Sequence, residues 1–420
     1  MPTEPSPHRA RRLCAEGDPD EALALFTRRG LDLAAARRLL ADRQNPPVPE
    51  PGLREVVLTD VRGRTTELAV YTPEGTDARE MGALVLLHGV GGSGPALLRR
   101  FQAFARRLNV SLLCPTARPV RSRSNQLDLA GLFGNRFDAP CWDLEGADFP
   151  LAALRWARTT LNAHPDRCVL GGTSMGALAT WNLAMRYGDR LSAALPINGA
   201  LSMWETFGTD RRKRALLHNV LPLPLFVVHG AQDTQIPPRF DRESVAQLRA
   251  AGHGQLRYTE VAGGQHALET LDLVNGDGPL FREVTDWLAA RRRPGAVTDI
   301  RHRAVDDEHG RCHWVALRGI TPQAVAEVHA ERLARDAIRI EVTGAEEVAL
   351  HLRGDLFAPG RVRVRLNGAE HTVEFRPATR RLLESYRATG DPGLLDEQVV
   401  TLPVPAVRDG LDAAGVGEST

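Results

Sequence analysis

Three side chains of this sequence have the types, and the order along the chain, that nucleophilic catalysis by a hydroxyl group requires. Ser174 is the central residue of GTSMG, which fits the pattern G-x-S-x-G. A serine hydroxyl is a weak nucleophile until a base removes its proton. Asp233, in HGAQDTQIP, and His266, in GGQHALE, follow in that order. We therefore expect a triad in which Ser174 attacks, His266 transfers the proton and Asp233 orients the imidazole ring.

The surroundings of Ser174 carry more weight than the pentapeptide itself, because chance matches are easy in a chain with 38 glycines. The segment RCVLGG at 167–172 predicts a buried strand, and the periodicity of 175–188 predicts a helix. A strand, a tight turn and a helix together present a nucleophilic serine at the edge of a sheet. The alternative is that Ser174 only caps the helix.

The expected partners of Ser174 also follow predicted strands. Asp233 comes directly after the apolar run 224–230, and His266 comes after the strand-like segment 256–263. Asp233 could instead be an ordinary turn aspartate. His253 is a rival for the base, but it precedes the second of these segments, which favours an ordinary loop position for it. The arrangement favours Asp233 as the carboxylate and His266 as the base of the triad.

Two backbone N–H groups are expected to complete the site, because an oxyanion hole needs donors aimed at one point. The first is expected from Met175, next to the nucleophile, and the second from Val90 in the glycine-rich loop HGVGGSG. Trp142 and Trp204 are candidate substrate-binding residues, although each could equally pack the loop that carries it. The motifs imply no metal ion and no organic cofactor.

Between residues 53 and 293, fully apolar segments alternate with segments of helical periodicity. This alternation is typical of a parallel sheet covered by helices on both faces, with ligands bound at the carboxyl ends of the strands. The first two strands are expected to form an antiparallel pair. The expected strands are 54–60, 66–72, 82–89, 110–115, 167–172, 192–199, 224–230 and 256–263, and the expected helices are 95–109, 150–162, 175–188, 239–252 and 278–293.

Two further regions flank this predicted catalytic domain at 53–293. Residues 1–52 predict a short helical segment, disordered over its first ten residues, and a proline-rich linker. Residues 294–405 are rich in strand-like alternation and predict a small antiparallel β-sandwich-like domain with one helix at 377–390. The last residues, 406–420, are expected to be a disordered tail.

Four motifs taken together, LLHGVGGSG, GGTSMGA, HGAQDTQIP and GGQHALE, resemble the α/β-hydrolase superfamily. More narrowly, they are similar to the carboxylesterase/phospholipase and dienelactone-hydrolase-like serine esterases. LLCPTARPVRSRSNQ and APCWDLEG are similar to a strand and a Trp-Asp loop of the carboxylesterase group. The resemblance covers 53–293 and implies a doubly wound, mostly parallel α/β sheet. The chain departs from it at Thr173 and Met175 and in its long C-terminal β region.

The function that these observations predict is a serine hydrolase that cleaves a small-molecule carboxylic ester through an acyl-enzyme intermediate. One alternative is a serine peptidase of the prolyl-oligopeptidase type, which resembles this chain in triad order. A second alternative is a binding protein that keeps the hydrolase fold without catalysis. An intact triad argues against the second alternative.

Composition excludes several other classes of function. The net charge is +1, so no overall field recruits nucleic acid, and no nucleic-acid partner is expected. The five cysteines are scattered without C-x-x-C spacing, which argues against disulfides and structural zinc. No apolar run is long enough for a membrane span, and the N-terminus does not have the pattern of a signal peptide, so a cytoplasmic location is expected. Nothing in the composition indicates an oligomeric state.

Overall fold

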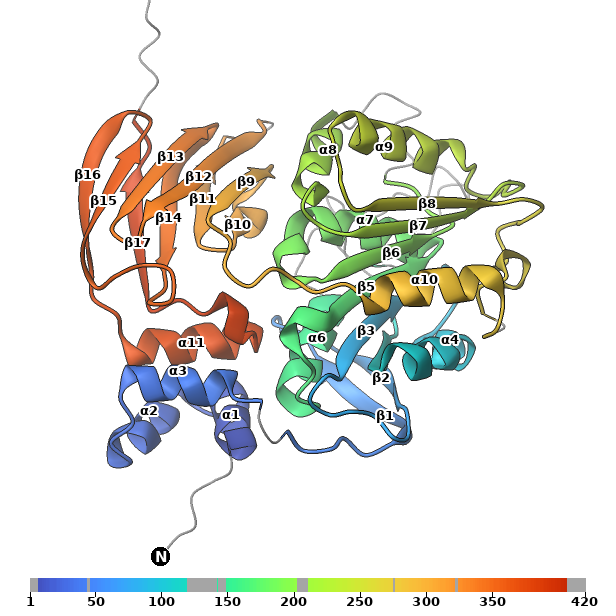
Figure 1. Ribbon diagram of the computed structural model, residues 1–420, viewed down its shortest axis with the longest axis horizontal. Coiled ribbons are helices and arrows are strands. Elements are labelled where there is room, and N and C mark those ends of the chain that lie inside the picture. Colours follow the sequence, from blue (N-terminus) through green and yellow to red (C-terminus); the bar gives the residue numbers. More distant parts are fainter. Residues whose placement is uncertain are drawn as a thin grey trace, which may run out of the picture.

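The computed structural model of the protein describes residues 7–43, 46–118, 142, 149–201, 211–274, 276–321 and 324–405. An α/β unit occupies the middle of the sequence (Figure 1). A unit of two β-sheets follows it, and a group of helices from both ends of the chain lies beside that second unit.

The α/β unit is built on one eight-stranded sheet in the order β1-β2-β4-β3-β5-β6-β7-β8. β2 runs antiparallel to both of its neighbours, whereas all pairs from β4 to β8 are parallel. This strand order with an antiparallel second strand is that of the α/β-hydrolase fold and confirms the predicted fold class. The strands are β1 (Gly52–Thr59), β2 (Thr65–Thr72), β3 (Gly82–Leu87), β4 (Val110–Pro115), β5 (Cys168–Thr173), β6 (Ala193–Ile197), β7 (Leu225–Gly230) and β8 (Leu256–Val261).

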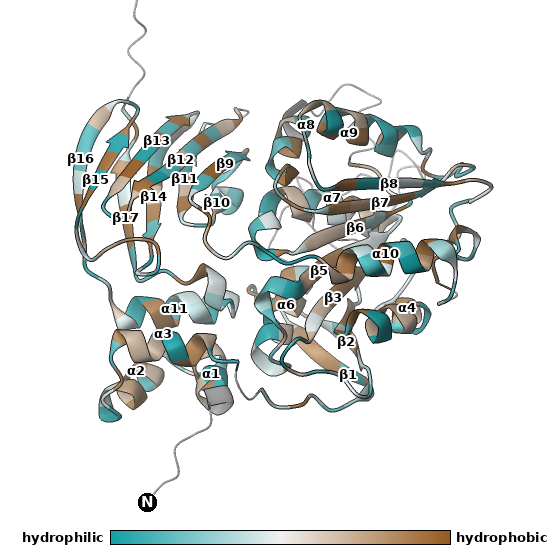
Figure 2. Ribbon diagram, viewed as in Figure 1, coloured by the Kyte–Doolittle hydropathy of each residue, from teal (hydrophilic) through white to brown (hydrophobic). Residues whose placement is uncertain are grey.

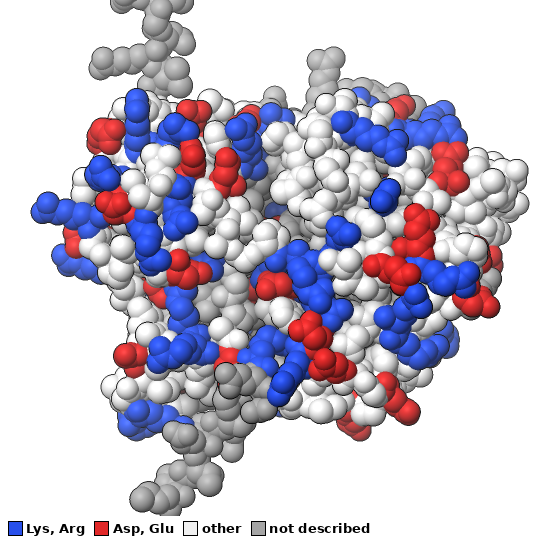
Figure 3. Space-filling view, in the orientation of Figure 1, with Lys and Arg blue, Asp and Glu red and all other residues white. Residues whose placement is uncertain are grey.

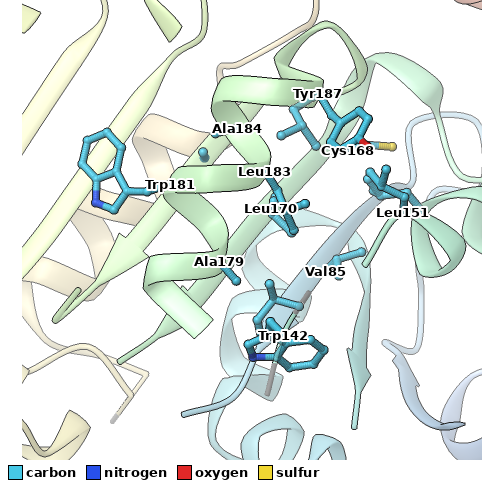
Figure 4. Close-up of a cluster of buried hydrophobic side chains, with 14 of the residues drawn as sticks. Val85, Trp142, Leu151, Cys168, Leu170, Ala179, Trp181, Leu183, Ala184 and Tyr187 are labelled. Atoms are coloured by element: carbon cyan, nitrogen blue, oxygen red, sulfur yellow. The ribbon is translucent and has the colours of Figure 1, made fainter. Parts of the chain in front are cut away.

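Helices cover both faces of this sheet, which explains why every residue of the central strands β3 to β7 is buried. α4 (Gly94–Leu108) and α10 (Pro279–Ala289) pack on one face, and α6 (Phe149–Thr160), α7 (Met175–Tyr187) and α9 (Arg239–Ala250) pack on the other. α8 (Arg211–Leu216) follows β6. Figure 2 shows the hydrophobic colouring of the central strands, and Figure 4 shows apolar side chains filling the space between α7 and the sheet. A fully apolar strand is stable only in such a two-sided core.

Local sequence signals set the ends of these helices. The side chain of Ser93 accepts a hydrogen bond from the backbone N–H of Ala96 at the start of α4, and a proline occupies the first turn. The helix ends at Asn109, whose φ of 53° lies in the left-handed region that asparagine tolerates better than most residues. The predicted helix at 95–109 therefore begins and ends close to the observed one.

The C-terminal unit consists of two facing sheets, with strand orders β10-β11-β14-β17 and β16-β15-β13-β12-β9. Its core lies between them and includes Trp314, whose ring meets that of Phe357 edge-on at 5.4 Å. The strands are β9 (Asp299–Ala304), β10 (Arg311–Cys312), β11 (Val315–Ile320), β12 (Ala326–Ala334), β13 (Ala337–Thr343), β14 (Ala345–Leu352), β15 (Gly360–Leu366), β16 (Ala369–Phe375) and β17 (Gln398–Pro403).

The expectation of a purely antiparallel sandwich was wrong for one strand pair. β13 and β15 run parallel, with Ile338 opposite Val364. The reason is that β14 crosses to the other sheet, so the chain returns to the first sheet in its original direction. β9 was also not predicted, because its short stretch DIRHRA alternates with charged residues and lies next to the presumed domain boundary.

The N-terminal helices pack against the C-terminal unit. α1 (Pro7–Glu16), α2 (Pro19–Arg28) and α3 (Leu33–Ala41) surround α11 (Thr379–Thr389), as Figure 1 shows. Phe26 and Leu40 are buried in one cluster with Leu382 and Tyr386. Expecting disorder through residue 10 was wrong from Pro7 onward, because α1 contributes buried side chains to this cluster. The expected disordered tail at 406–420 lies outside the described residues.

Buried charges join the α/β unit to the C-terminal unit. Both terminal nitrogens of Arg293 donate to the carboxylate of Asp391, at 2.5 and 2.8 Å, and Arg158 pairs with the same carboxylate at 3.1 Å. All three side chains are almost completely buried. Although burial raises the pKa of Asp391, these two guanidinium groups hold it well below its ordinary value. On the visible surface, by contrast, acidic and basic side chains are interspersed (Figure 3).

Candidate active site

Ser174 lies in a strained turn between β5 and α7. Its backbone has φ 54° and ψ −121°, a conformation that costs a residue with a side chain on the order of 1–3 kcal/mol. The surrounding structure holds it there, because its N–H donates to the carbonyl of Ile197 on β6 at 3.0 Å. The turn therefore presents the Ser174 hydroxyl at the carboxyl end of β5, the position expected for a nucleophile elbow.

The second glycine of the G-x-S-x-G pattern has a steric explanation. A Cβ atom on Gly176 would lie 2.0 Å from the carbonyl oxygen of Leu87, at the end of β3. Only glycine lets the first turn of α7 approach the sheet so closely. The second glycine of the pattern is therefore required for α7 to pack against β3.

A continuous chain of hydrogen bonds joins the three residues that the sequence singles out. Nε2 of His266 lies 2.8 Å from Oγ of Ser174, and Nδ1 of His266 lies 2.7 Å from Oδ2 of Asp233. An ionised carboxylate can only accept, so the proton of the neutral ring is on Nδ1. Nε2 then presents its lone pair to the serine hydroxyl, which is the tautomer that a general base needs.

Asp233 is fully buried and is held from two sides. Its Oδ1 accepts hydrogen bonds from the backbone N–H groups of Gln235 and Ile236, both at 2.9 Å. Burial raises the pKa of Asp233, but hydrogen bonds from His229, His266 and the backbone of Ile236 outweigh it and hold the pKa far below the ordinary value. The carboxylate therefore stays ionised and oriented toward the ring of His266.

Asn198, which belongs to none of the four sequence motifs, fixes the loop that carries His266. Its side-chain amide donates to the backbone carbonyls of Gln265 and His266, at 3.0 and 2.9 Å, and its Oδ1 accepts from the N–H of Gly230 at 2.8 Å. The side chain thus ties the histidine loop to the end of β7. The signal available in the sequence was an Asn-Gly pair directly after a buried strand, and Asn198 indeed has φ 50°.

A pocket of about 360 Å³ opens in front of Ser174. Val90 and Met175, the two expected oxyanion donors, both line it. Met175 begins α7, where backbone N–H groups have no acceptor within the helix. The loop that carries Val90 also touches the nucleophile, because a Cβ on Gly89 would lie 3.1 Å from Cβ of Ser174. Other described lining residues include Leu178, Ile236, Leu268, Arg100 and Glu269.

Of the two candidate substrate residues, Trp142 does not line this pocket. The indole of Trp142 is completely buried, donates from Nε1 to the carbonyl of His88 at 3.0 Å and packs against the His88 ring. It therefore supports the loop before Val90, contrary to the expectation of substrate contact. Trp204 lies outside the described residues. His253, the rival base, is buried beyond the end of α9, where its Nδ1 accepts from the N–H of Gln255.

Within the described part of the chain, no cluster of three or more histidine, cysteine or carboxylate side chains is arranged to hold a metal ion. None of the helices found in the same ranges is long and apolar enough to cross a membrane.

No family model matches the sequence, and no curated protein matches it. Solved structures do resemble the chain. An S-formylglutathione hydrolase from Staphylococcus aureus is 15% identical, covers 58% of this chain and 99% of its own, and has a TM-score of 0.41. An acetyl xylan esterase from Aspergillus awamori is 14% identical over 56% of this chain and 98% of its own, with a TM-score of 0.43. A puromycin-hydrolyzing peptidase from Mycobacterium tuberculosis is 16% identical over 53% of this chain and 38% of its own, with a TM-score of 0.41.

The fold and the site of the α/β unit are defined by its own strand order and by the turn at Ser174. β5 and α7 present Ser174, the loop after β7 presents Asp233, and the loop after β8 presents His266. These three loops meet at the carboxyl ends of parallel strands, which is where open α/β sheets bind their ligands. The region from β1 to α10 therefore has an α/β-hydrolase fold, with a serine, a histidine and an aspartate joined by hydrogen bonds beside its pocket.

Proposed function

We propose that the protein is a serine hydrolase that cleaves a carboxylic ester through an acyl-enzyme intermediate. The observation that carries the proposal is the hydrogen-bond chain from Asp233 through His266 to the strained Ser174. A helix cap would need neither a base on its hydroxyl nor a buried carboxylate behind that base. Ser174 also makes no side-chain capping hydrogen bond to α7, which disfavours the capping alternative.

In the proposed reaction, Oγ of Ser174 attacks the ester carbonyl while Nε2 of His266 takes the hydroxyl proton. Asp233 stabilises the imidazolium that forms. The N–H groups of Met175 and Val90 are the proposed donors to the oxyanion of the tetrahedral intermediate. Collapse of that intermediate breaks the bond to the leaving alkoxide, which receives the proton from His266. Water then repeats the same steps on the acyl-enzyme and releases the carboxylic acid.

The described pocket wall supports a small substrate with an apolar part. Leu178, Ile236 and Leu268 contribute apolar surface near Ser174, and a volume of about 360 Å³ is at the small end of ligand sites. The two charged side chains of the wall, Arg100 and Glu269, pair with each other. An uncharged acyl group therefore suits this wall better than an ionic one.

A panel of nitrophenyl esters of graded acyl length tests the proposal. We expect hydrolysis by the wild-type protein, with a preference among the shorter chains, and a loss of hydrolysis in Ser174→Ala. The matched control is Ser244→Ala, since Ser244 is a buried serine of α9 that donates only to the carbonyl of Phe240. Hydrolysis of aminoacyl arylamides with esters left intact would instead favour the peptidase. A wild-type protein that neither turns over nor reacts with a fluorophosphonate would be a binding protein.

A further inference from the structure

His229, at the end of β7, lies completely buried between two carboxylates and takes no part in the reaction described above. Its Nδ1 lies 2.7 Å from Oδ2 of Asp241, the third residue of α9. Its Nε2 lies 2.8 Å from the carbonyl oxygen of Ile236 and 3.4 Å from Oδ2 of Asp233. The same oxygen of Asp233 accepts from His266, so His229 lies directly behind the triad.

The hydrogen-bond partners of His229 determine where its protons are. A backbone carbonyl can only accept, so Nε2 must donate to Ile236. Nδ1 faces the carboxylate of Asp241, whose other oxygen already accepts from Nε1 of Trp181 at 3.0 Å. Burial lowers the pKa of His229, but hydrogen bonds to Asp233 and Asp241 outweigh it and raise the pKa to about 9. Burial also raises the pKa of Asp241, and with that carboxyl ionised both ring nitrogens of His229 carry protons at neutral pH.

Among the described residues, Glu260 also interacts electrostatically with His229, but its charge is neutralised by a partner. On β8, Glu260 accepts from Arg242 of α9 at 2.7 Å and from the hydroxyl of Tyr258 at 2.8 Å. Arg242 in particular lowers the pKa of Glu260 to about 2. The two aspartates are therefore the carboxylates that hold the charge of His229.

The contacts of Asp241 with His229 and Trp181 also connect His229 to the helix that follows the nucleophile. Trp181 is a fully buried residue of α7, the helix that begins one residue after Ser174, and Figure 4 shows its indole on the flank of that helix. Trp181, Asp241 and His229 thus join the helix of Ser174 to the turn of Asp233.

We propose that His229 is a positively charged positioning residue of the active site, a role that rests on the proposed hydrolase function. Its Nε2–H holds the Ile236 carbonyl and faces Asp233, and Asp241, anchored by Trp181, holds its other proton. The charge keeps Asp233 ionised and limits how strongly that carboxylate draws a proton onto His266. Nε2 of His266 is thereby left to accept the proton of Ser174.

Two substitutions separate the charge of His229 from its hydrogen bond. His229→Gln removes the charge and weakens the hydrogen bond to the carbonyl of Ile236. We therefore expect kcat toward a nitrophenyl ester to fall about tenfold or more, with KM changed less than twofold. Asp241→Asn removes the counter-charge but leaves Nε2–H on Ile236 and an acceptor for Trp181. Its kcat should fall less. In both variants the acid limb of the pH profile of kcat/KM should move to higher pH.

His253→Gln is the matched control, because it replaces a buried histidine outside the site and should leave both kcat and the acid limb unchanged. Thermal unfolding of each variant shows whether lost activity reflects lost folded protein. If His229→Gln does not fold, Asp241→Asn carries the test. Wild-type values of kcat and of the acid limb in folded variants would overturn the proposal.

Nuclear magnetic resonance of ¹⁵N-labelled histidines gives a readout that needs no substrate. We expect the His229 ring of the wild-type protein to be doubly protonated at pH 7 and to lose a proton near pH 9. In Asp241→Asn, which lacks one of the two carboxylates that raise the pKa of His229, the ring should lose its proton at a lower pH than in the wild type. A neutral His229 ring in the wild type at pH 7, or an unchanged His229 titration in Asp241→Asn, would overturn the inference even in active protein. A wild type that shows neither hydrolysis nor fluorophosphonate labelling would overturn the proposed function instead, while the titration of His229 still decides its charge.

Discussion

Oγ of Ser174 and Nε2 of His266 lie 2.8 Å apart although 92 positions of sequence separate the two residues. The contact depends on a backbone conformation at Ser174 that is unfavourable for any residue with a side chain. Nucleophile geometry and local stability therefore oppose each other at this position.

Replacing Ser174 in two ways should separate these effects. Ser174→Ala and Ser174→Gly both remove the hydroxyl, and each should lower kcat/KM for ester hydrolysis by about 10³-fold or more. Ser174→Gly should also raise the free energy of unfolding above that of Ser174→Ala by roughly 1 kcal/mol, because glycine adopts a positive φ without strain. Denaturant unfolding measures the difference. Equal stabilities would show that the turn stores no strain.

Gly176→Ala should destabilise the protein strongly, against the usual helix preference for alanine. In an exposed helix the change would add about 1 kcal/mol of stability. Here the new Cβ would meet the Leu87 carbonyl at 2.0 Å, so α7 has to move away from β3. We expect a loss of several kcal/mol and of activity. Gly188→Ala is the control, since its Cβ would find its nearest neighbour, a methyl of Leu223, at 3.6 Å, and thermal unfolding compares the two.

Asn198→Asp should impair catalysis more than stability alone explains. The change removes the amide that donates to the carbonyls of Gln265 and His266 and places a carboxylate against them. We expect kcat to fall about tenfold, because the His266 loop loses its tie to β7, and stability to fall by about 1–3 kcal/mol. Asn367→Asp is a close control in the C-terminal unit, where Asn367 has φ 46° and exchanges two similar hydrogen bonds with Val342. Its kcat should stay at the wild-type value, and a matching fall there would contradict a role for Asn198 at the site.

Asp391→Asn should weaken the connection between the two units. It leaves Arg158 and Arg293 buried without their shared counter-charge, and breaking a buried pair in this way costs about 3–5 kcal/mol. Asp355→Asn, at a partly exposed carboxylate paired with Arg353, should cost far less. Chemical denaturation followed by tryptophan fluorescence compares the two variants. Equal costs would mean that the buried network does not hold the units together.

The same carboxylate should contribute to acid unfolding. The pKa of Asp391 is lowered in the folded state, so its stabilisation is fully present above the ordinary carboxyl pKa of 3.8 and is lost as the pH falls below it. The free energy of unfolding of the wild type should therefore approach that of Asp391→Asn as the pH falls below about 4. Parallel pH curves for the two proteins would contradict this assignment.

Much of the fold could be predicted because its signals are local. The fully apolar runs that became β3 to β7 can be stable only inside a sheet covered on both faces, and the prolines, capping residues and glycines between them mark where helices begin and end. Ser174, Asp233 and His266 each follow a predicted strand, and their order could be read from the sequence alone. Their catalytic roles remain proposals that the experiments above decide.

What the sequence determined by itself was the alternation of elements and the identity of the three residues, since both depend on residue type and spacing along the chain. The roles of residues that contact distant parts of the chain depended on the tertiary structure. Trp142 entered the core, Asn198 became the tie of the histidine loop, and His229 came to lie between Asp233 and Asp241. Equally, α1 to α3 packed on α11 from the far end of the chain. A hydrogen bond or a buried charge depends on which groups folding brings within about 3 Å of each other, and no local pattern encodes that distance.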